Sequence, residues 1–500
     1  MVLVSLVATG VSHMQLKGNR QLFLDDEGVA ETLRVSRRYH SPVKYVGNPL
    51  LVGNQFHDAR EGVRYEEDRV PREGGVPKLN PDLTPTSVVR SPSGLFQMYY
   101  QTKPPGIRDF GYGGGTPVVA YAESHNGVHW RLPALNRVEI NGSTENNVLF
   151  EPPGSLPSVV IDDYDSDDAR RYKMLYYPHN ISFSPDGVSW SNVQKVRVPS
   201  RIGHSDGLNC LAGWDGNIGR YVAYFRPQVA RPDEAIDPEG LSIRLIARSE
   251  SEDLTGWTEL ETVLAPDGDD PAGTEFQTIG VFFYEGMYVG LLCVHEGFAE
   301  ERPKRFPYRL PDWPAHSAML GRCFVELVTS RDGIHWNRSE GRVPFLDNTP
   351  GGLDSGVIWP SNSPVVVGDE LWFYYGMAVH SHGLSYMKLP GLARLRRDGF
   401  ASLAAGEQAG WILTEPMICP GGRLHVNADA RGGELSASVF EEDGYHAPEY
   451  AAVRCARLDG DAISHWITWF ERTDLDPLKG KAIRLKFYLR QAELFSYWFA

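Results

Sequence analysis

The segment Ser330-Arg331-Asp332-Gly333-Ile334-His335-Trp336 shows a pattern that recurs along the chain: a serine, an Asp-Gly or Asn-Gly pair, and an aromatic residue. Such a pair after a β-type run predicts a tight turn between two strands, because both residues tolerate a positive φ angle. Close copies are SHNGVHW at 124–130 and SPDGVSW at 184–190, and looser copies are SEDLTGW at 251–257 and RDGF at 397–400. Five copies of one turn indicate a repeated structural unit.

Each copy of the turn follows the same succession of runs: a short apolar run, an aromatic-rich run, and a run that enters the turn. The aromatic-rich runs are LFQMYYQ at 95–101, RYKMLYYP at 171–178, RYVAYFRP at 220–227, MYVGLLCVH at 287–295 and LWFYYGMAVH at 371–380. The aromatic residues that close the five turns, at 130, 190, 257, 336 and 400, are 60, 67, 79 and 64 residues apart. Antiparallel units repeated at this spacing predict an all-β chain folded as a five-bladed β-propeller with long loops.

The last part of the chain, 405–500, has no copy of this turn. Alternating apolar and polar residues at 423–429, 434–440 and 482–490 predict a separate antiparallel β-sandwich of typical domain size. We therefore expect a propeller over 15–404 and a sandwich over 405–500, with a hinge near 406–411. The apolar run in 1–14 lacks the basic residues of a signal peptide and the length of a membrane span, and we expect a leader or tag remnant there.

The composition is that of a globular protein, with 42% hydrophobic and 23% charged residues, and with 12 Trp, 23 Tyr and 21 Phe that need burial. With 49 basic against 64 acidic residues, the formal net charge is −15, which argues against nucleic acid or an anionic membrane as a partner. The five cysteines are scattered, so we expect neither a disulfide framework nor a structural zinc site. An assembly of several copies of the chain is left open.

Carboxylates stand at corresponding places of several repeats, next to the run predicted to form the first strand of each blade. Because first strands line the central channel of a propeller, their ends bring sequence-distant side chains into one pocket. Asp82, Asp206, Glu275 and Asp354 precede such runs, and Asp162 ends one. Glycoside hydrolysis requires paired carboxylates, one acid for the leaving oxygen and one base or nucleophile. We predict Glu275 as the general acid, Asp206 or Asp354 as the base or nucleophile, and Asp162 as a partner that binds a substrate hydroxyl or tunes a pKa.

Further polar and aromatic side chains near these positions suit the binding of sugar hydroxyls and of the apolar face of a sugar ring. The predicted substrate-binding residues are Asp82, Asn147, His204, Asn209, Trp359, His380, His382 and Arg64. His380 and His382 are two metal-ligand types without an identifiable third ligand, and the chain has no dinucleotide-binding or P-loop motif. We therefore predict no metal and no cofactor.

Several segments resemble a group of bacterial proteins related to glycoside hydrolase families 32 and 43. They are QLFLDD at 21–26, RRYHSP at 37–42, GNPL at 47–50, VID at 160–162, RYKM at 171–174, the turn at 330–336 and DSG at 354–356. RLKF at 484–487 and AELFS at 492–496 resemble the β-sandwich appended to those proteins. The resemblance implies a five-bladed propeller, activity on glycosides, Asp162 as the counterpart of the family's middle aspartate and Glu275 as its acid. The blade-one motif W-M-N-D-P-N-G is not present.

The favoured function is a glycoside hydrolase that acts on a glycan or oligosaccharide terminus. Action at chain ends is inferred from the polar segment 55–83, which is predicted to fold over the channel mouth and narrow it into a pocket. Two alternatives stay open: a glycan-binding propeller without chemistry, and a polysaccharide lyase with a uronate-binding arginine such as Arg226 or Arg64. We expect a cytoplasmic protein or, where a natural signal peptide has been removed, a secreted or periplasmic one.

Overall fold

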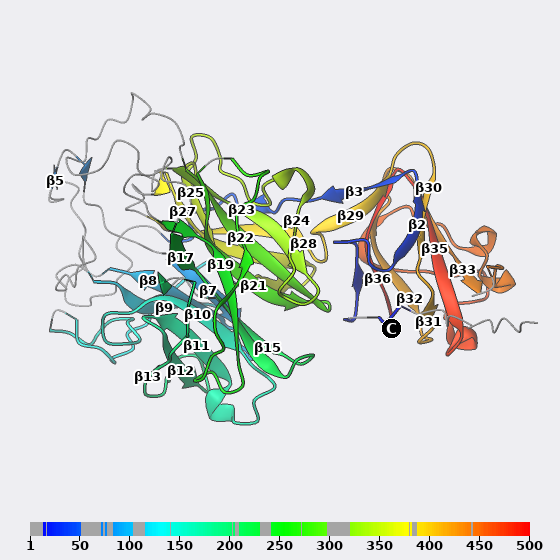
Figure 1. The fold of residues 1–500 in the computed structure, drawn as a ribbon. Coiled ribbons are helices and arrows are strands. Elements are labelled where there is room, and N and C mark those ends of the chain that lie inside the picture. Colours follow the sequence, from blue (N-terminus) through cyan, green and yellow to red (C-terminus); the bar gives the residue numbers. More distant parts are fainter. Residues whose placement is uncertain are drawn as a thin grey trace, which may run out of the picture. The chain divides into compact units, whose positions relative to one another are not determined.

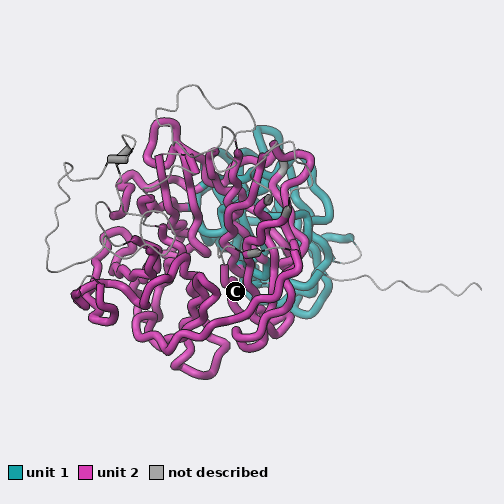
Figure 2. Tube along the Cα trace, turned by 60° about the vertical axis from the view of Figure 1, so that its left-hand side comes forward, with its two compact units in different colours: residues 1–41, 284–287, 395–500 teal, residues 42–283, 288–394 magenta. Residues whose placement is uncertain are grey.

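The computed structural model describes residues 14–16, 18–51, 72–73, 76–77, 84–103, 116–140, 142–202, 204–205, 210–230, 242–271, 273–297, 321–379, 381–382, 388–441 and 444–500. The chain divides into two compact units: unit 1 comprises 1–41, 284–287 and 395–500, and unit 2 comprises 42–283 and 288–394 (Figure 2). The described residues form strands and a few short 3-10 helices (Figure 1), so the predicted all-β class is confirmed. Within these ranges no helix has the length and apolar character needed to cross a membrane.

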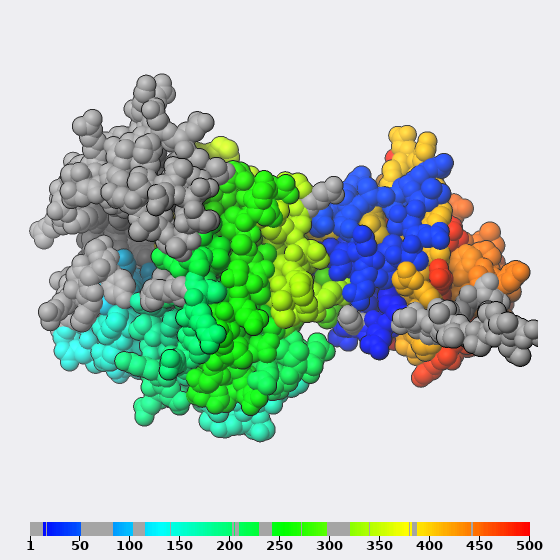
Figure 3. Space-filling view, viewed as in Figure 1, coloured from blue at the N-terminus to red at the C-terminus, as the bar shows by residue number. Residues whose placement is uncertain are grey.

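Unit 2 is a series of mainly antiparallel sheets that follow one another along the chain, from cyan through green to yellow-green in the face shown in Figure 3. The strands β23 (Gly321–Ser330) and β25 (Val357–Pro360) pair in parallel. The first sheet contains β7 (Thr84–Arg90), β8 (Phe96–Thr102) and β9 (Val118–Ser124). The second contains β10 (Ser155–Ile161), β11 (Tyr172–Tyr177), β12 (Asn180–Ser184) and β13 (Gln194–Lys195), with the 3-10 helix η2 (Asp168–Arg170) before β11. The short strands β5 (Arg72–Glu73) and β6 (Val76–Pro77) precede these sheets in the sequence and pair with each other.

The third sheet contains β15 (Cys210–Asp215), β16 (Arg220–Phe225), β19 (Ile246–Ser251) and β20 (Glu261–Leu264), beside a small sheet of β14 (His204–Ser205), β17 (Pro227–Ala230) and β18 (Ser242–Arg244). A nine-stranded sheet follows, with the order β21 (Thr274–Tyr284), β22 (Met287–Gly297), β23 (Gly321–Ser330), β25 (Val357–Pro360), β27 (Glu370–Ala378), β28 (Leu389–Arg396) and β4 (Val43–Lys44). At its sides lie β24 (Asn337–Arg338), β26 (Val365–Val367) and the 3-10 helix η3 (Glu340–Arg342).

The repeated turn has the same hydrogen bonds at each of its copies in unit 2. In the second sheet, the Gly187 N–H donates to Ser184 Oγ at 2.9 Å, and Asp186 Oδ1 accepts from the N–H groups of Val188 and Ser189 at 2.8 and 2.6 Å. Equivalent contacts occur at Ser124 and Asn126, at Ser251 and Asp253, and at Ser330 and Asp332. In the third copy Leu254 takes the glycine position with a φ of 71°. The turn therefore forms from contacts within three residues of its Asp or Asn.

The first strands β7, β10 and β15 contact one another through their middle residues. Thr86 Oγ1 of β7 donates to the Pro157 carbonyl of β10 at 2.5 Å. The Leu211 N–H of β15 donates to Ser158 Oγ of β10 at 2.7 Å.

The remaining first strands, β21 and β25, continue this series and return it to its start. The Val281 N–H of β21 donates to Cys210 Sγ of β15 at 3.1 Å. A Cβ atom on Gly280 would lie 2.5 Å from the Ser361 carbonyl, so this position admits the close approach of the segment after β25 only as glycine. Asn362 then donates through Nδ2 to Ser87 Oγ of β7 at 3.0 Å and also to Ser158 Oγ of β10. The contacts among the first strands thus close on themselves.

Unit 1 consists of two antiparallel sheets that share one apolar core. One sheet contains β1 (Gln21–Leu22), β3 (Val35–Tyr39), β29 (Ala401–Ala405), β36 (Ala492–Phe499), β32 (Leu424–Asp429) and β34 (Asp461–Trp466), and the other contains β2 (Val29–Leu33), β30 (Gly410–Thr414), β35 (Ala482–Arg490), β31 (Met417–Ile418) and β33 (Glu434–Glu441). Three 3-10 helices complete the unit: η5 (Pro448–Tyr450), η6 (Ala452–Arg454) and η7 (Asp476–Leu478). In β35 every second residue is buried, as expected for a strand with one face on a core.

The first described strands of the chain belong to unit 1. The sequence analysis grouped 15–41 with the repeats, whereas in the structure β2 pairs with β30 and β3 pairs with β29. This pairing joins segments more than 350 residues apart, which no local pattern indicates. The boundaries at 15–404 and 405–500 stay predictions.

Candidate functional site

Glu275 is the second residue of β21, ahead of the contacts that this strand makes with the other first strands. Its side chain is 1% exposed, and its Oε2 accepts a hydrogen bond from Arg244 Nη1 at 2.6 Å. A buried carboxylate is costly unless it is paired, and Arg244 at the end of β18 provides that pairing. Because arginine keeps its protons, Oε2 acts as an acceptor, and a transferable proton would have to reside on Oε1.

A second arginine makes a parallel contact two residues farther along β21. Arg226 Nη1 donates to the Gln277 carbonyl at 2.9 Å and to its Oε1 at 2.7 Å. Both side chains are buried. Since alternate residues of a strand point to the same face, Glu275 and Gln277 share a face of β21, and the two arginines reach it side by side.

Two histidines, a tryptophan and a lysine complete the described part of this group. The short turn at 285–286 joins β21 to β22, so the end of β22 with His295 lies beside the beginning of β21. The rings of His295 and His382 are 4.9 Å apart, and His382 stacks on Trp359 with a centroid distance of 5.8 Å and an angle of 7°. Lys388 Nζ lies 4.4 Å from the centroid of the Trp359 ring. The indole face predicted to hold a sugar is therefore already in contact with His382 and Lys388.

The surroundings of His382 favour its neutral form. Burial lowers the pKa of His382 well below its usual range, and His295 together with the positive charges of Arg244, Lys388 and Arg226 acts in the same direction. A neutral imidazole offers one donor and one acceptor nitrogen. At neutral pH His382 can therefore either donate a hydrogen bond to a hydroxyl group or accept one from it.

Asp354 is held by a lysine in the turn before β25. Its Oδ2 accepts from Lys44 Nζ at 2.5 Å, and its Oδ1 accepts from the Thr349 N–H at 3.1 Å. Lys44 also donates to Thr349 Oγ1 at 2.7 Å. The Asp354 carboxylate thus ties β4 to this turn, and no described contact joins it to Glu275.

Asp162 lies on the far side of the sheets from Glu275. It follows β10 and accepts from Lys173 Nζ at 2.9 Å and from Tyr221 OH at 2.7 Å. Tyr221 stands at the beginning of β16, whereas Arg226 at the other end of the same strand contacts the Glu275 group. The structure therefore does not bring Asp162 together with Glu275.

The hydrogen bonds of Asp162 keep it ionised. Burial by itself raises the pKa of Asp162, but the hydrogen bonds from Tyr221, Lys173 and the Tyr164 N–H outweigh it and hold the pKa below its ordinary value. An acid role would need the opposite shift.

The other predicted residues are distributed differently. Asn147 is fully buried in unit 2, where its Nδ2 donates to Tyr100 OH at 2.6 Å and to the Tyr121 carbonyl at 2.8 Å. Of His204 only the backbone, in β14, is described. The remaining predicted residues lie outside the described ranges: Asp82, Asp206, Asn209, His380 and Arg64.

Sequence reasoning missed Arg244, Gln277, His295 and Lys388, and considered Arg226 only for a lyase. One available signal lies at or near the end of three aromatic-rich runs: Arg226 in RYVAYFRP, His295 at the end of MYVGLLCVH and His380 at the end of LWFYYGMAVH. The run RYKMLYYP ends instead in Tyr-Pro. Arg244 and Lys388 carry no comparable signal.

The group combines an anchored carboxylate, two guanidinium groups, neutral imidazole and an indole, which are groups that bind and polarise a hydroxylated substrate. Throughout the described ranges, no set of three or more His, Cys, Asp or Glu side chains is arranged to hold a metal ion. The five cysteines, all within these ranges, are buried free thiols.

Comparisons with known proteins give structural similarities only. No protein family and no curated protein matches this sequence. The fold is similar to a structure from the GH130 family of mannoside phosphorylases, described as containing glycoside hydrolases that target β-1,2-mannosidic linkages in Candida mannan, with 14% identity over 72% of this chain and 94% of that chain and a TM-score of 0.43.

Two further structures show similarity of the same degree. A glycosyl hydrolase from Bacteroides ovatus has 13% identity over 72% of this chain and 94% of that chain, with a TM-score of 0.42. The β-1,2-mannobiose phosphorylase from Listeria innocua has 12% identity over 71% of this chain and 96% of that chain, with a TM-score of 0.43. At these values the activities of those proteins are not transferred to this chain, and the relation to families 32 and 43 stays a prediction.

Proposed function

We propose that this chain is a glycan-acting enzyme, a glycoside hydrolase whose reacting centre contains Glu275. The observation that supports this proposal is the buried Glu275–Arg244 pair beside neutral His382 and Trp359. Ionisable groups that are buried at one strand end, with partners drawn from several sheets, are typical of functional sites.

Within this proposal, Glu275 is the ionised member of the catalytic pair. Its contact with Arg244 favours a base or nucleophile over the acid role assigned from the sequence, because Oε2 is committed as an acceptor. The acid then falls to another carboxylate, and we propose Asp206 for it, in place of the base or nucleophile role predicted from the sequence. Arg244 orients the Glu275 carboxylate, and His382 binds a sugar hydroxyl.

The proposal includes the architecture. Unit 2 is proposed to be a five-bladed β-propeller and unit 1 a β-sandwich, in keeping with the closed series of first-strand contacts and with the shared core of the two sheets. Action at chain ends stays part of the proposal, although the segment 55–83 on which it depends lies mostly outside the described residues.

The test is turnover by Glu275→Gln on a panel of aryl glycosides and oligosaccharides, with reducing-end release as the readout. We expect a loss of about 10²–10⁴-fold in kcat, the range that proton transfer contributes. The matched control is Glu326→Gln in β23, a glutamate that is also buried and paired with an arginine, Arg338 at 2.9 Å. The control is expected to lower stability while its folded fraction keeps the turnover of the wild type. Near-normal release by folded Glu275→Gln would refute the assignment.

A polysaccharide lyase is the second candidate, favoured by one observation: neutral His382 lies in a group with Arg226 and Arg244. An eliminating enzyme needs such a base and a cation that binds the uronate. Elimination and hydrolysis both leave a new reducing end. Ultraviolet absorbance of an unsaturated uronate would support the lyase, and new reducing ends without that absorbance would support the hydrolase. Sugar binding without either product would support the non-catalytic alternative.

A further inference from the structure

Arg226 lies between β16 and β17 in unit 2, and Arg244 ends β18, the strand that pairs with β17. Phe225 pairs with Ala247 and Gln228 pairs with Arg244 in one continuous register, which places Arg226 two residues from the position opposite Arg244. Residues in this diagonal relation share a face, with Cα atoms about 7–8 Å apart. The two arginines therefore extend from the same face of these paired segments.

Their hydrogen bonds show where the two guanidinium groups lie. Arg244 Nη1 donates to Glu275 and Arg226 Nη1 donates to Gln277, and these two residues share a face of β21. The groups are therefore held next to each other at the beginning of a first strand. Buried acceptors fix the direction of both side chains, which lowers the entropy lost when a ligand binds.

A third cation reaches the same place from another sheet. Lys388 precedes β28 and lies over the Trp359 ring, which stacks on His382. The His382 ring in turn lies 4.9 Å from the ring of His295, at the end of β22 beside the beginning of β21 that Arg244 and Arg226 contact. Among the described side chains of this group, Glu275 is the anionic one.

We propose that Arg226, Arg244 and Lys388 form an oxyanion-binding subsite, which binds a carboxylate or phosphate group next to the bond that reacts. This inference rests on the proposed function and names the substrate class for that site. Guanidinium groups bind carboxylate and phosphate oxygens with paired hydrogen bonds, whereas a neutral sugar does not require three cations. The oxyanion has two chemical sources: the carboxylate of an acidic sugar residue, or inorganic phosphate.

The experiment measures binding, so that it does not depend on turnover. Isothermal titration calorimetry of the full chain compares D-glucuronate and D-galacturonate with D-glucose and D-galactose, and inorganic phosphate is titrated separately. We expect the wild type to bind a uronate at least about 10-fold more tightly than its neutral counterpart, as one charge-assisted hydrogen bond provides. Uronate binding locates the charge on the sugar, and binding of phosphate alone locates it on a separate anion.

Two variants test the residues. Arg226→Gln and Lys388→Gln are each expected to weaken binding of the preferred oxyanion by about 10–100-fold and to leave the neutral sugars unaffected. The charge-matched control is Arg220→Gln at the opposite end of β16, where Arg220 pairs with Glu252 at 2.8 Å, and we expect it to bind like the wild type. Where Arg226→Gln does not fold, Arg226→Lys keeps the charge and removes the paired geometry, and an intermediate loss is expected.

Equal affinity for charged and neutral sugars, or unchanged oxyanion binding by both variants, would overturn the inference. The two proposals fail separately. A protein that binds uronate but cleaves no glycoside disproves the hydrolase and leaves the subsite standing. A protein that hydrolyses neutral glycosides and ignores both oxyanions does the reverse.

Discussion

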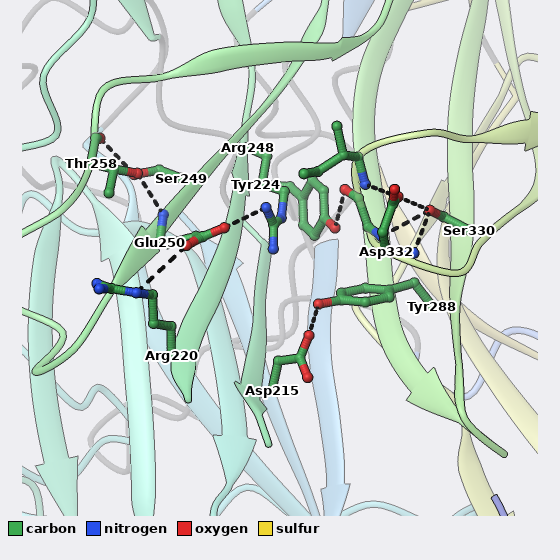
Figure 4. A network of polar contacts seen from close by, with 12 residues as sticks. Asp215, Arg220, Tyr224, Arg248, Ser249, Glu250, Thr258, Tyr288, Ser330 and Asp332 are labelled. Carbon is green, nitrogen blue, oxygen red and sulfur yellow. Dashed lines mark hydrogen bonds and ion pairs between the residues drawn. The ribbon is translucent and has the colours of Figure 1, made fainter. Parts of the chain in front are cut away.

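In β16 and β22, the second strands of their sheets in unit 2, the polar side chains at the two ends have different kinds of partners. At the beginning of β16, Tyr221 donates to Asp162, and at the beginning of β22, Tyr288 donates to Asp215 (Figure 4). The same hydrogen bond thus occurs twice, and we call it the repeated tie. It joins a tyrosine to the carboxylate at the end of the first strand of the preceding sheet. At the other end of these strands Arg226 and His295 have partners that do not repeat.

Buried carboxylates in unit 2 therefore fall into two groups, one structural and one that is a candidate for function. Asp162 and Asp215 have equivalent partners in successive sheets, as expected when the contact holds neighbouring sheets together. Glu275 is paired with Arg244, which comes from a strand outside the regular sheet, whereas Asp354, at the corresponding place of another repeat, is paired with Lys44. Repetition of the partner therefore marks Asp162 and Asp215 as structural carboxylates, which burial alone does not.

The largest effect is expected from removing the buried lysine at the structural end. Lys173 has a fully buried side chain and pairs with Asp162 and Asp165. Lys173→Met leaves buried carboxylate charge uncompensated, so the free energy of unfolding should fall by about 3–5 kcal/mol, measured by urea denaturation. Sugar binding by the folded fraction should be unchanged, and altered binding would contradict the separation of the two ends.

A smaller effect is expected from the tyrosines that make the repeated tie. Tyr288→Phe removes one of the two hydrogen bonds described at Asp215, the other coming from the Asn217 N–H, and should cost about 1–3 kcal/mol. Tyr221→Phe should cost less, because Asp162 keeps Lys173. Urea denaturation of both variants provides the measurement, and the reverse order would show that the two ties are not equivalent.

The site end can be probed by titration. Because burial and nearby positive charges lower the pKa of His382, its imidazole should stay neutral through the interval near pH 6.5 in which histidine usually titrates. The unfolded chain takes up this proton and the folded chain does not, so His382 reduces stability as the pH falls below about 6.5. NMR detection of the ring, assigned with His382→Gln, checks this, and a transition centred near pH 6.5 would contradict it.

The smallest effect concerns a solvent-exposed turn. Hydrogen bonds from the Gly256 N–H and from Thr255 lower the pKa of Asp253 to about 2. The stability that Asp253 contributes is complete above its unfolded value of about 3.9 and is lost as the pH falls from about 4 towards 2. The melting temperature of Asp253→Asn should therefore change less over this interval than that of the wild type. Parallel curves would show that the turn does not depend on the charge.

The repeated turn was predictable because its hydrogen bonds join residues no more than three positions apart. The order of the strands in unit 2 was predictable for the same reason, because each strand type has its own local sequence pattern. Leu254 shows the limit of that reasoning, because the turn keeps its geometry with a leucine in the glycine position.

The partners of the charged residues were not predictable. Asp354 was a reasonable candidate by its position, but in the structure it accepts a hydrogen bond from Lys44, a residue 310 positions earlier in the chain. Asp162 was chosen with the other carboxylates although it follows its strand, and its partners Lys173 and Tyr221 come from two different sheets. A sequence pattern gives the position of a side chain along its strand. Its charged partner depends on which strands become neighbours in the fold, and the pattern does not show this.

The pairing of β4 with β28 has a consequence for the synthesis of the protein. Val43 and Lys44 pair with Arg394 and Ala393, so the last strand of the final sheet in unit 2 comes from the beginning of that unit. During translation the N-terminal segment has to wait, unpaired, until its partner has left the ribosome, about 350 residues later at about 5–20 residues per second. Contacts of such long range form slowly. The N-terminal segment therefore stays without its partner strand for tens of seconds, and a chaperone that covers exposed strands should raise the yield of this protein.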